Sequence, residues 1–123
     1  MDDLESIKQL KARFTRAVDS RDWDTCRRLL TDDFSVTSPG GGTVSGADAF
    51  VERFRSALSE GWTVHHAHMP DVELTSETTA RGTWSMEGWN RWPDGRELHE
   101  FGVNRETYEK LDGDWRISSS KVD

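Results

Sequence analysis

Apolar and polar residues follow two different periods along this chain, and the change comes near its middle. In the first half, apolar residues recur every three or four positions, which predicts amphipathic helices. This pattern predicts helices over residues 4–18, 23–30 and 48–58. Between the last two, the alternation at residues 34–37 and the apolar Val44 predict two short strands.

From Trp62 onward the apolar residues have the two-residue period of β-strands. Pro70 is expected to interrupt the first strand, and Asp112-Gly113 is a strong hairpin signal before the last one. Helices followed by hairpin-linked strands predict an α+β fold, with N-terminal helices packed on a strongly curved antiparallel β-sheet. We see no linker or repeat, so residues 1–123 are expected to form one domain. The expected strands cover residues 62–69, 72–74, 79–92, 98–110 and 115–122.

Composition narrows the partners that we expect. The chain has 23 acidic and 16 basic side chains, and its net charge of −7 argues against a nucleic acid or an anionic membrane as partner. No apolar run approaches a membrane span, and the single cysteine, Cys26, fits a cytoplasmic location. The six tryptophans and the low aliphatic content predict an aromatic-rich core completed by a second subunit, and hence a homodimer.

Histidine is the richest chemical signal, because three of the four lie between Val64 and His68. On a strand, His66 and His68 point to one face and His65 to the other. Three interpretations are open: a general base, a metal site, or strand histidines without a chemical role. His66 and His68 followed by Glu73 resemble the first metal motif of cupins.

Asp19 is the second candidate, because it follows the apolar face of the first predicted helix and could reach the sheet. A helix-end aspartate without a chemical role is the competing interpretation. Aromatic and apolar side chains line most ligand pockets as well as most cores, so the pattern does not separate the two. The residues that we expect to line a pocket are Phe14, Trp23, Phe54, Trp84, Met86 and Asn104.

Several segments together resemble SnoaL-like proteins of the nuclear transport factor two-like superfamily. The resemblance runs through nearly the whole chain and implies a cone, in which a curved sheet is wrapped by helices around a deep apolar cavity. It rests on Ile7–Phe14 with Ala17–Trp23, on Phe34, on the predicted helix 48–58, on Val64-His65-His66-x-His68, on Ala80-x-Gly82-x-Trp84, and on the run from Glu106 to Ile117.

The resemblance also implies a site. In dehydratase-type members, an aspartate at the end of the first helix orients a histidine on the first long strand, and this histidine removes a proton. The matching positions here are Asp19 and His65, so the resemblance selects His65 over His66. Such members often carry a strong polar group on the last strand, where this chain has residues 118–120, all serine. The group that assists departure of the leaving group is therefore unassigned, with Asn104, Asn90 and His99 as candidates.

Taken together, these features predict a cofactor-independent lyase or isomerase acting on a small, largely apolar molecule. His65 would be the base and Asp19 its orienting partner. One alternative is a non-catalytic ligand-binding or dimerisation module of the same fold. The other is a cupin-like metal site formed by His66, His68 and Glu73.

Overall fold

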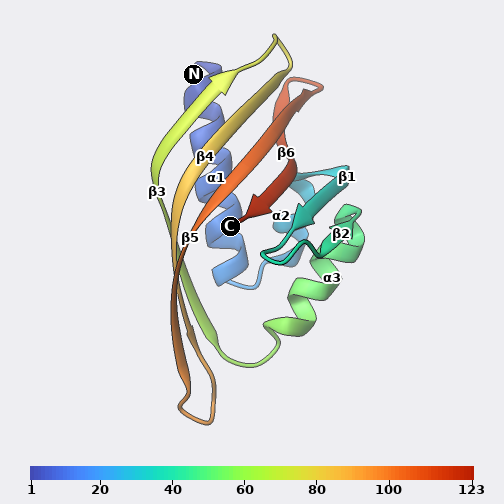
Figure 1. The fold of residues 1–123 in the computed structure, drawn as a ribbon. Helices are drawn as coiled ribbons and strands as arrows, with labels where there is room; N and C mark the ends of the chain where they lie inside the picture. Colours follow the sequence, from blue (N-terminus) through green and yellow to red (C-terminus); the bar gives the residue numbers. More distant parts are fainter.

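The computed structural model describes all residues from Met1 to Asp123 (Figure 1). It contains three helices and six strands. The helices are α1 (Asp3–Asp19), α2 (Trp23–Arg28) and α3 (Ala47–Ala57). The strands are β1 (Leu30–Thr37), β2 (Thr43–Ser45), β3 (Trp62–Leu74), β4 (Thr79–Arg91), β5 (Glu97–Leu111) and β6 (Asp114–Val122). None of the helices has the length and apolar character that a membrane span requires.

Local sequence signals account for where the first two helices begin. Asp2 caps α1 by accepting a hydrogen bond from the backbone N–H of Glu5, and Asp22 caps α2 in the same way through Thr25. The helix predicted over 23–30 is shorter in the structure. Leu30 begins β1 instead, where it is fully buried against the sheet.

The six strands form one curved sheet in the order β2-β1-β6-β5-β4-β3. The last strand, β6, lies between β1 and β5. It runs parallel to β1, and all other neighbouring strands are antiparallel. The sheet does not close, and β2 and β3 are its edges. The predicted α+β fold is confirmed, with α1 lying against the sheet and α3 beside β1 and β2 (Figure 1).

The prediction that Pro70 interrupts a strand is wrong. Strand β3 continues through it, because an edge strand tolerates a residue without a backbone donor. The cost is a bulge between His68 and Asp71, where Met69 takes a positive φ of 53°.

This bulge sets the register of the site. Between the bulge and the turn that joins β3 to β4, Val72 stands opposite Gly82. Continuing that register would place His65 opposite Trp89, but after the bulge it stands opposite Gly88. The shift brings His65 onto the same face as Val72.

The main core lies between this inner face of the sheet and the helices. Ile7 and Leu10 of α1 pack with Leu30, Phe34 and Tyr108 of the strands in one buried cluster. Phe50 of α3 packs between two further aromatic rings: it is edge-on to Phe34 at 4.9 Å and stacked on Phe54 at 5.0 Å between ring centroids. The core is thus aromatic on the α3 side, as the composition predicts.

Candidate active site

Asp19 and His65 meet at the junction of α1 and β3. Asp19 is the last residue of α1, and its Oδ1 lies 2.7 Å from Nδ1 of His65. Its other oxygen, Oδ2, accepts the backbone N–H of His65 at 2.8 Å. The two side chains are 21% and 26% exposed, so water reaches them but does not surround them. Two hydrogen bonds from one carboxylate hold both the backbone and the ring of His65.

Further groups hold the carboxylate itself. The hydroxyl of Thr63, two residues before His65, donates to Asp19 Oδ1 at 3.0 Å. Arg21 donates to that hydroxyl at 2.8 Å and also reaches the backbone oxygens of Val18 and Gly61. Arg21 has a positive φ of 62°, which turns the chain sharply after α1. A strained turn and a buried threonine therefore fix the end of α1 against the start of β3.

The space for the imidazole is provided by Gly88 on β4. A Cβ atom at this position would lie 3.3 Å from Cδ2 and 3.6 Å from Nε2 of His65. Since Nδ1 faces the carboxylate, it carries the proton in the neutral ring, and the lone pair is on Nε2. Nε2 has no hydrogen-bond partner within the protein. A histidine held in this way can accept a proton at Nε2.

Asp19 and His65 line one hollow of about 600 Å³ between α1 and the edge of the sheet. Trp84 supplies part of its wall. The hollow is also lined by three cationic side chains of α1: Lys8, Lys11 and Arg16. A group that develops negative charge here would have positive charges nearby.

The sequence profile of the SnoaL-like domain matches residues 1–121. The chain belongs to the SnoaL-like domain family. Solved structures with this fold include a protein of Novosphingobium aromaticivorans provisionally named a scytalone dehydratase, with TM-score 0.90 and 19% identity over 97% of this chain and 81% of that one. The hexachlorocyclohexane dehydrochlorinase LinA-type3 of Novosphingobium barchaimii has TM-score 0.85 and 19% identity, over 97% of this chain and 84% of that one.

A third similar structure, from Novosphingobium aromaticivorans and provisionally named an aromatic ring hydroxylase, has TM-score 0.89 and 19% identity. It is matched over 100% of this chain and 91% of that one. The three names describe three different activities. At such identities the likeness establishes the shared cone-like fold, and the reaction has to be argued from the site.

The SnoaL-like chain also has an apolar cavity of about 530 Å³ between the sheet and α3. Phe14, Phe54 and Asn104 line it, while Asp19 and His65 do not. Trp23 packs edge-on against Phe54, with ring centroids 6.4 Å apart, and Met86 lines neither hollow. The residues expected to share one pocket are thus divided: three line the cavity beside α3, Trp84 lines the other hollow, and Trp23 and Met86 line neither.

A buried polar network that the sequence analysis did not identify stands between these hollows. Lys11 lines both of them, and its Nζ lies 2.8 Å from Glu106 Oε2, with both side chains 3% exposed. Tyr108 donates to Glu106 and accepts from Trp84 Nε1, each at 2.9 Å. The signal was present in the sequence: Lys11 falls on the apolar face of α1, four residues after Ile7, and Glu106 on the face of Tyr108.

The alternative metal site of His66, His68 and Glu73 is not formed. His66 and His68 point away from His65 to the outer face of the sheet, and the Glu73 carboxylate pairs with Arg81. The carboxylate beside the two histidines is that of Glu87 on β4. Spacing along one strand could not reveal this, because the partner comes from the next strand.

Proposed function

We propose that this SnoaL-like chain is a cofactor-independent lyase or isomerase that removes a proton from carbon in a small molecule. The carrying observation is the 2.7 Å contact between Asp19 Oδ1 and His65 Nδ1, in two residues that line one hollow, with Nε2 free of any protein partner. His65 is the base in this proposal. Asp19 fixes its tautomer and stabilises the imidazolium that forms.

The proton passes from a substrate carbon to Nε2 of His65. The electron pair of the broken C–H bond then takes one of two courses. In a lyase it forms a C=C bond while a leaving group departs from the adjacent carbon with its own bonding electrons. In an isomerase it moves into a neighbouring carbonyl, and the proton returns at another carbon. Both courses create negative charge on the leaving group or on oxygen, where Lys8 and Arg16 supply positive charge, while the charge of Lys11 is paired with Glu106.

Because the substrate class is broad, the test measures exchange of the abstracted proton with solvent rather than one particular product. Small β-hydroxy and β-halo ketones are incubated with the chain in D₂O, and mass spectrometry detects deuterium at the acidic carbon. Scytalone and hexachlorocyclohexane, the compounds in the names of two similar structures, serve as further probes through water loss and chloride release. We expect exchange or elimination with the wild-type chain and none with His65→Gln, while Glu87→Gln on the outer face, outside the lining of the hollow, keeps full activity. Equal activity of the wild type and His65→Gln would contradict the proposal.

One observation favours a second function, the binding of an apolar ligand without catalysis. The 530 Å³ cavity beside α3 does not include His65 or Asp19 in its lining, so a ligand enclosed there would not contact the base. Binding of an apolar fluorescent probe that is unchanged in His65→Gln, together with no deuterium exchange in any compound, would support this function over the first.

We retain the expected homodimer as part of the proposal. The outer face of the sheet leaves Phe101 75% exposed and Trp89 40% exposed, and a second copy would cover such side chains. A mass in solution twice that of the 14.1 kDa chain is the expected result. A single 14.1 kDa species across the micromolar range would contradict it.

A further inference from the structure

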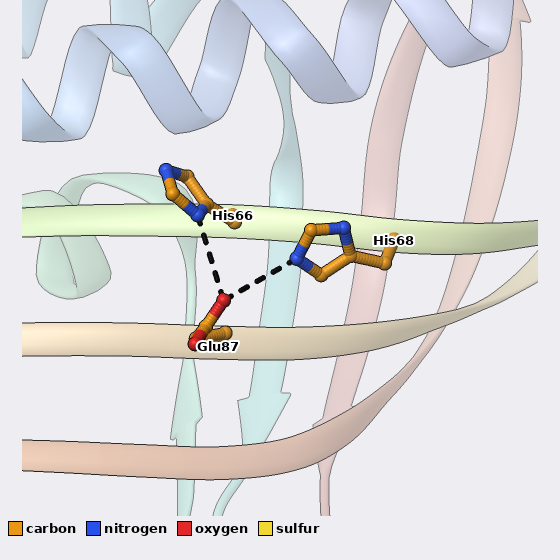
Figure 2. A group of neighbouring side chains, drawn as sticks. All are labelled: His66, His68 and Glu87. Carbon is orange, nitrogen blue, oxygen red and sulfur yellow. Dashed lines mark hydrogen bonds and ion pairs between the residues drawn. The ribbon is translucent and has the colours of Figure 1, made fainter.

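The outer face of the sheet gathers three of the four histidines around one carboxylate. Glu87 Oε1 lies 3.5 Å from His66 Nδ1 and 3.5 Å from His68 Nε2 (Figure 2). Its second oxygen, Oε2, lies 2.9 Å from His99 Nε2. Both histidines of β3 point toward the same carboxylate oxygen (Figure 2).

Strand register explains this convergence. His66 and His68 are two residues apart on β3, so their side chains share a face. His66 stands directly opposite Glu87 of β4, on the side of the bulge where the register has shifted by one residue. His99 on β5 stands opposite Trp89 of β4, so it is a diagonal cross-strand neighbour of Glu87. Three adjacent strands therefore contribute to one cluster.

We propose that His66, His68 and Glu87 bind a divalent transition-metal ion, with Zn²⁺ as the ion that the donor set fits best. Their three donor atoms all lie within 4.8 Å of one another. Nitrogen and oxygen ligands sit about 2.0–2.2 Å from zinc, so neighbouring ligands of a tetrahedral ion are about 3.4 Å apart. The two 3.5 Å separations are long for hydrogen bonds but match this spacing.

His99 acts on this site through Glu87. Its ring stacks on Trp89 with centroids 3.6 Å apart and packs against Phe101 at 4.5 Å, which fixes its orientation. Its hydrogen bond to Oε2 leaves Oε1 turned toward the other two histidines. Such outer partners commonly orient metal ligands.

The site is open, and His66 and His68 also line the rim of the hollow that holds Asp19 and His65, whereas Glu87 does not. In the single chain the side chains of His66 and His68 are 53% and 54% exposed, so a bound ion would keep at least one position for water or another ligand. A second copy that covers Phe101 on β5 would have to leave these histidines of the edge strand β3 uncovered. His65 points to the other face of the sheet and belongs to none of these contacts. The metal site and the proposed proton transfer can thus fail or succeed separately.

The test is Zn²⁺ binding to the full chain after chelator treatment and dialysis, measured by titration calorimetry, with the absorption spectrum of Co²⁺ as a report on its ligands. We expect one ion per chain. His68→Gln and Glu87→Gln each remove a ligand and should weaken binding at least 10-fold, and His99→Gln should weaken it by a smaller factor.

Glu73→Gln is the matched control, since it makes the same charge change on β3 without touching the cluster. It should leave affinity within about 2-fold, as should His65→Gln. Absence of Zn²⁺ binding by the wild type at 0.1 mM would overturn the proposal, as would equal loss in Glu73→Gln and Glu87→Gln. One ion per two chains would also contradict a site built by a single chain. Deuterium exchange by the metal-free protein measures the proposed enzyme function independently.

Discussion

Strand β3 presents adjacent histidines to two different environments. On the inner face, His65 is 26% exposed, and a single carboxylate holds both its ring and its backbone at 2.7 and 2.8 Å. On the outer face, His66 and His68 are more than half exposed, and their contacts to Glu87 are 3.5 Å long. The first arrangement is fixed before any ligand arrives, and the second retains freedom to close around one.

This difference corresponds to two kinds of chemistry. A general base gains from preorganisation, because its tautomer and direction must be set before the proton moves. A metal site can complete its geometry when the ion binds, since the ion itself pulls the donors together. The same residue type therefore supports different roles on the two faces, and variants of each face should separate them.

The largest effect is expected from His65→Gln. Removing the base should lower proton abstraction by about 10²–10⁴-fold. Glu87→Gln, at a position outside the lining of the hollow that holds His65, should leave that rate unchanged and weaken Zn²⁺ binding instead. The measurement is deuterium incorporation and zinc affinity on both variants side by side. A parallel loss of both properties in either variant would show that the two faces are not independent.

The buried inner network should make the inner face sensitive in stability as well. Lys11→Met leaves the Glu106 carboxylate buried without its partner, which should cost about 3–5 kcal/mol of unfolding free energy. Urea denaturation measures this difference. The double variant Lys11→Met with Glu106→Leu should recover much of the loss, because the unpaired charge is gone. A single variant as stable as the wild type would mean that Glu106 finds another partner or water.

Zinc should stabilise the chain only through the outer face. At a free Zn²⁺ concentration 100 times the dissociation constant, binding to the folded state adds about 2.7 kcal/mol. Thermal melts with and without Zn²⁺ should show a rise in Tm for the wild type and for Glu73→Gln. Glu87→Gln should lose most of that rise. Equal zinc shifts in the wild type and Glu87→Gln would place the bound ion elsewhere.

A smaller effect is expected from Gly88→Ala. The added methyl group would lie 3.3 Å from Cδ2 of His65, tighter than an ordinary contact, so the ring must shift by a few tenths of an ångström. Misplacing a base is costly, and we expect the rate of proton abstraction to fall about 10-fold with little change in stability. Gly42→Ala, in a loop where the new Cβ meets no atom and φ is not positive, controls for the loss of a glycine. An unchanged rate in Gly88→Ala would show that the imidazole can shift without loss of function.

The helices, most strand limits and the hairpins could be predicted from the sequence because they follow from local periodicity and turn residues. The sequence pattern could not choose between His65 and His66, since alternation gives two faces without saying which is buried. The choice depended on the bulge at Met69 and Pro70, which shifts β3 by one residue against β4. The resemblance to SnoaL-like proteins selected His65 because His65 occupies the position that matches the family's histidine.

The partners of each histidine were harder to predict than the histidines themselves. Glu87 lies 21 positions after His66 and reaches it only through strand pairing, whereas Glu73 is near in sequence and bound to Arg81. Lys11 was accessible to sequence reasoning, because a lysine on the apolar face of α1 needs a buried partner. Cross-strand contacts require register, and register is a property of the whole sheet.

The smallest effect should come from Thr63→Val. This variant tests how much the position of His65 depends on the hydroxyl that links Asp19 to Arg21. The substitution keeps the shape of the side chain but removes the hydroxyl that donates to Asp19 Oδ1 and accepts from Arg21. Asp19 keeps its two bonds to His65, so the ring stays in place and the rate of proton abstraction should fall only about 3-fold. Thr83→Val, on the outer side of β4, is the matched control and should not change that rate. If Thr63→Val instead lowered the rate as much as His65→Gln, the Asp19–His65 contact would depend on the whole chain of bonds from Arg21. The base would then be positioned by the turn after α1 as much as by the strand that carries it.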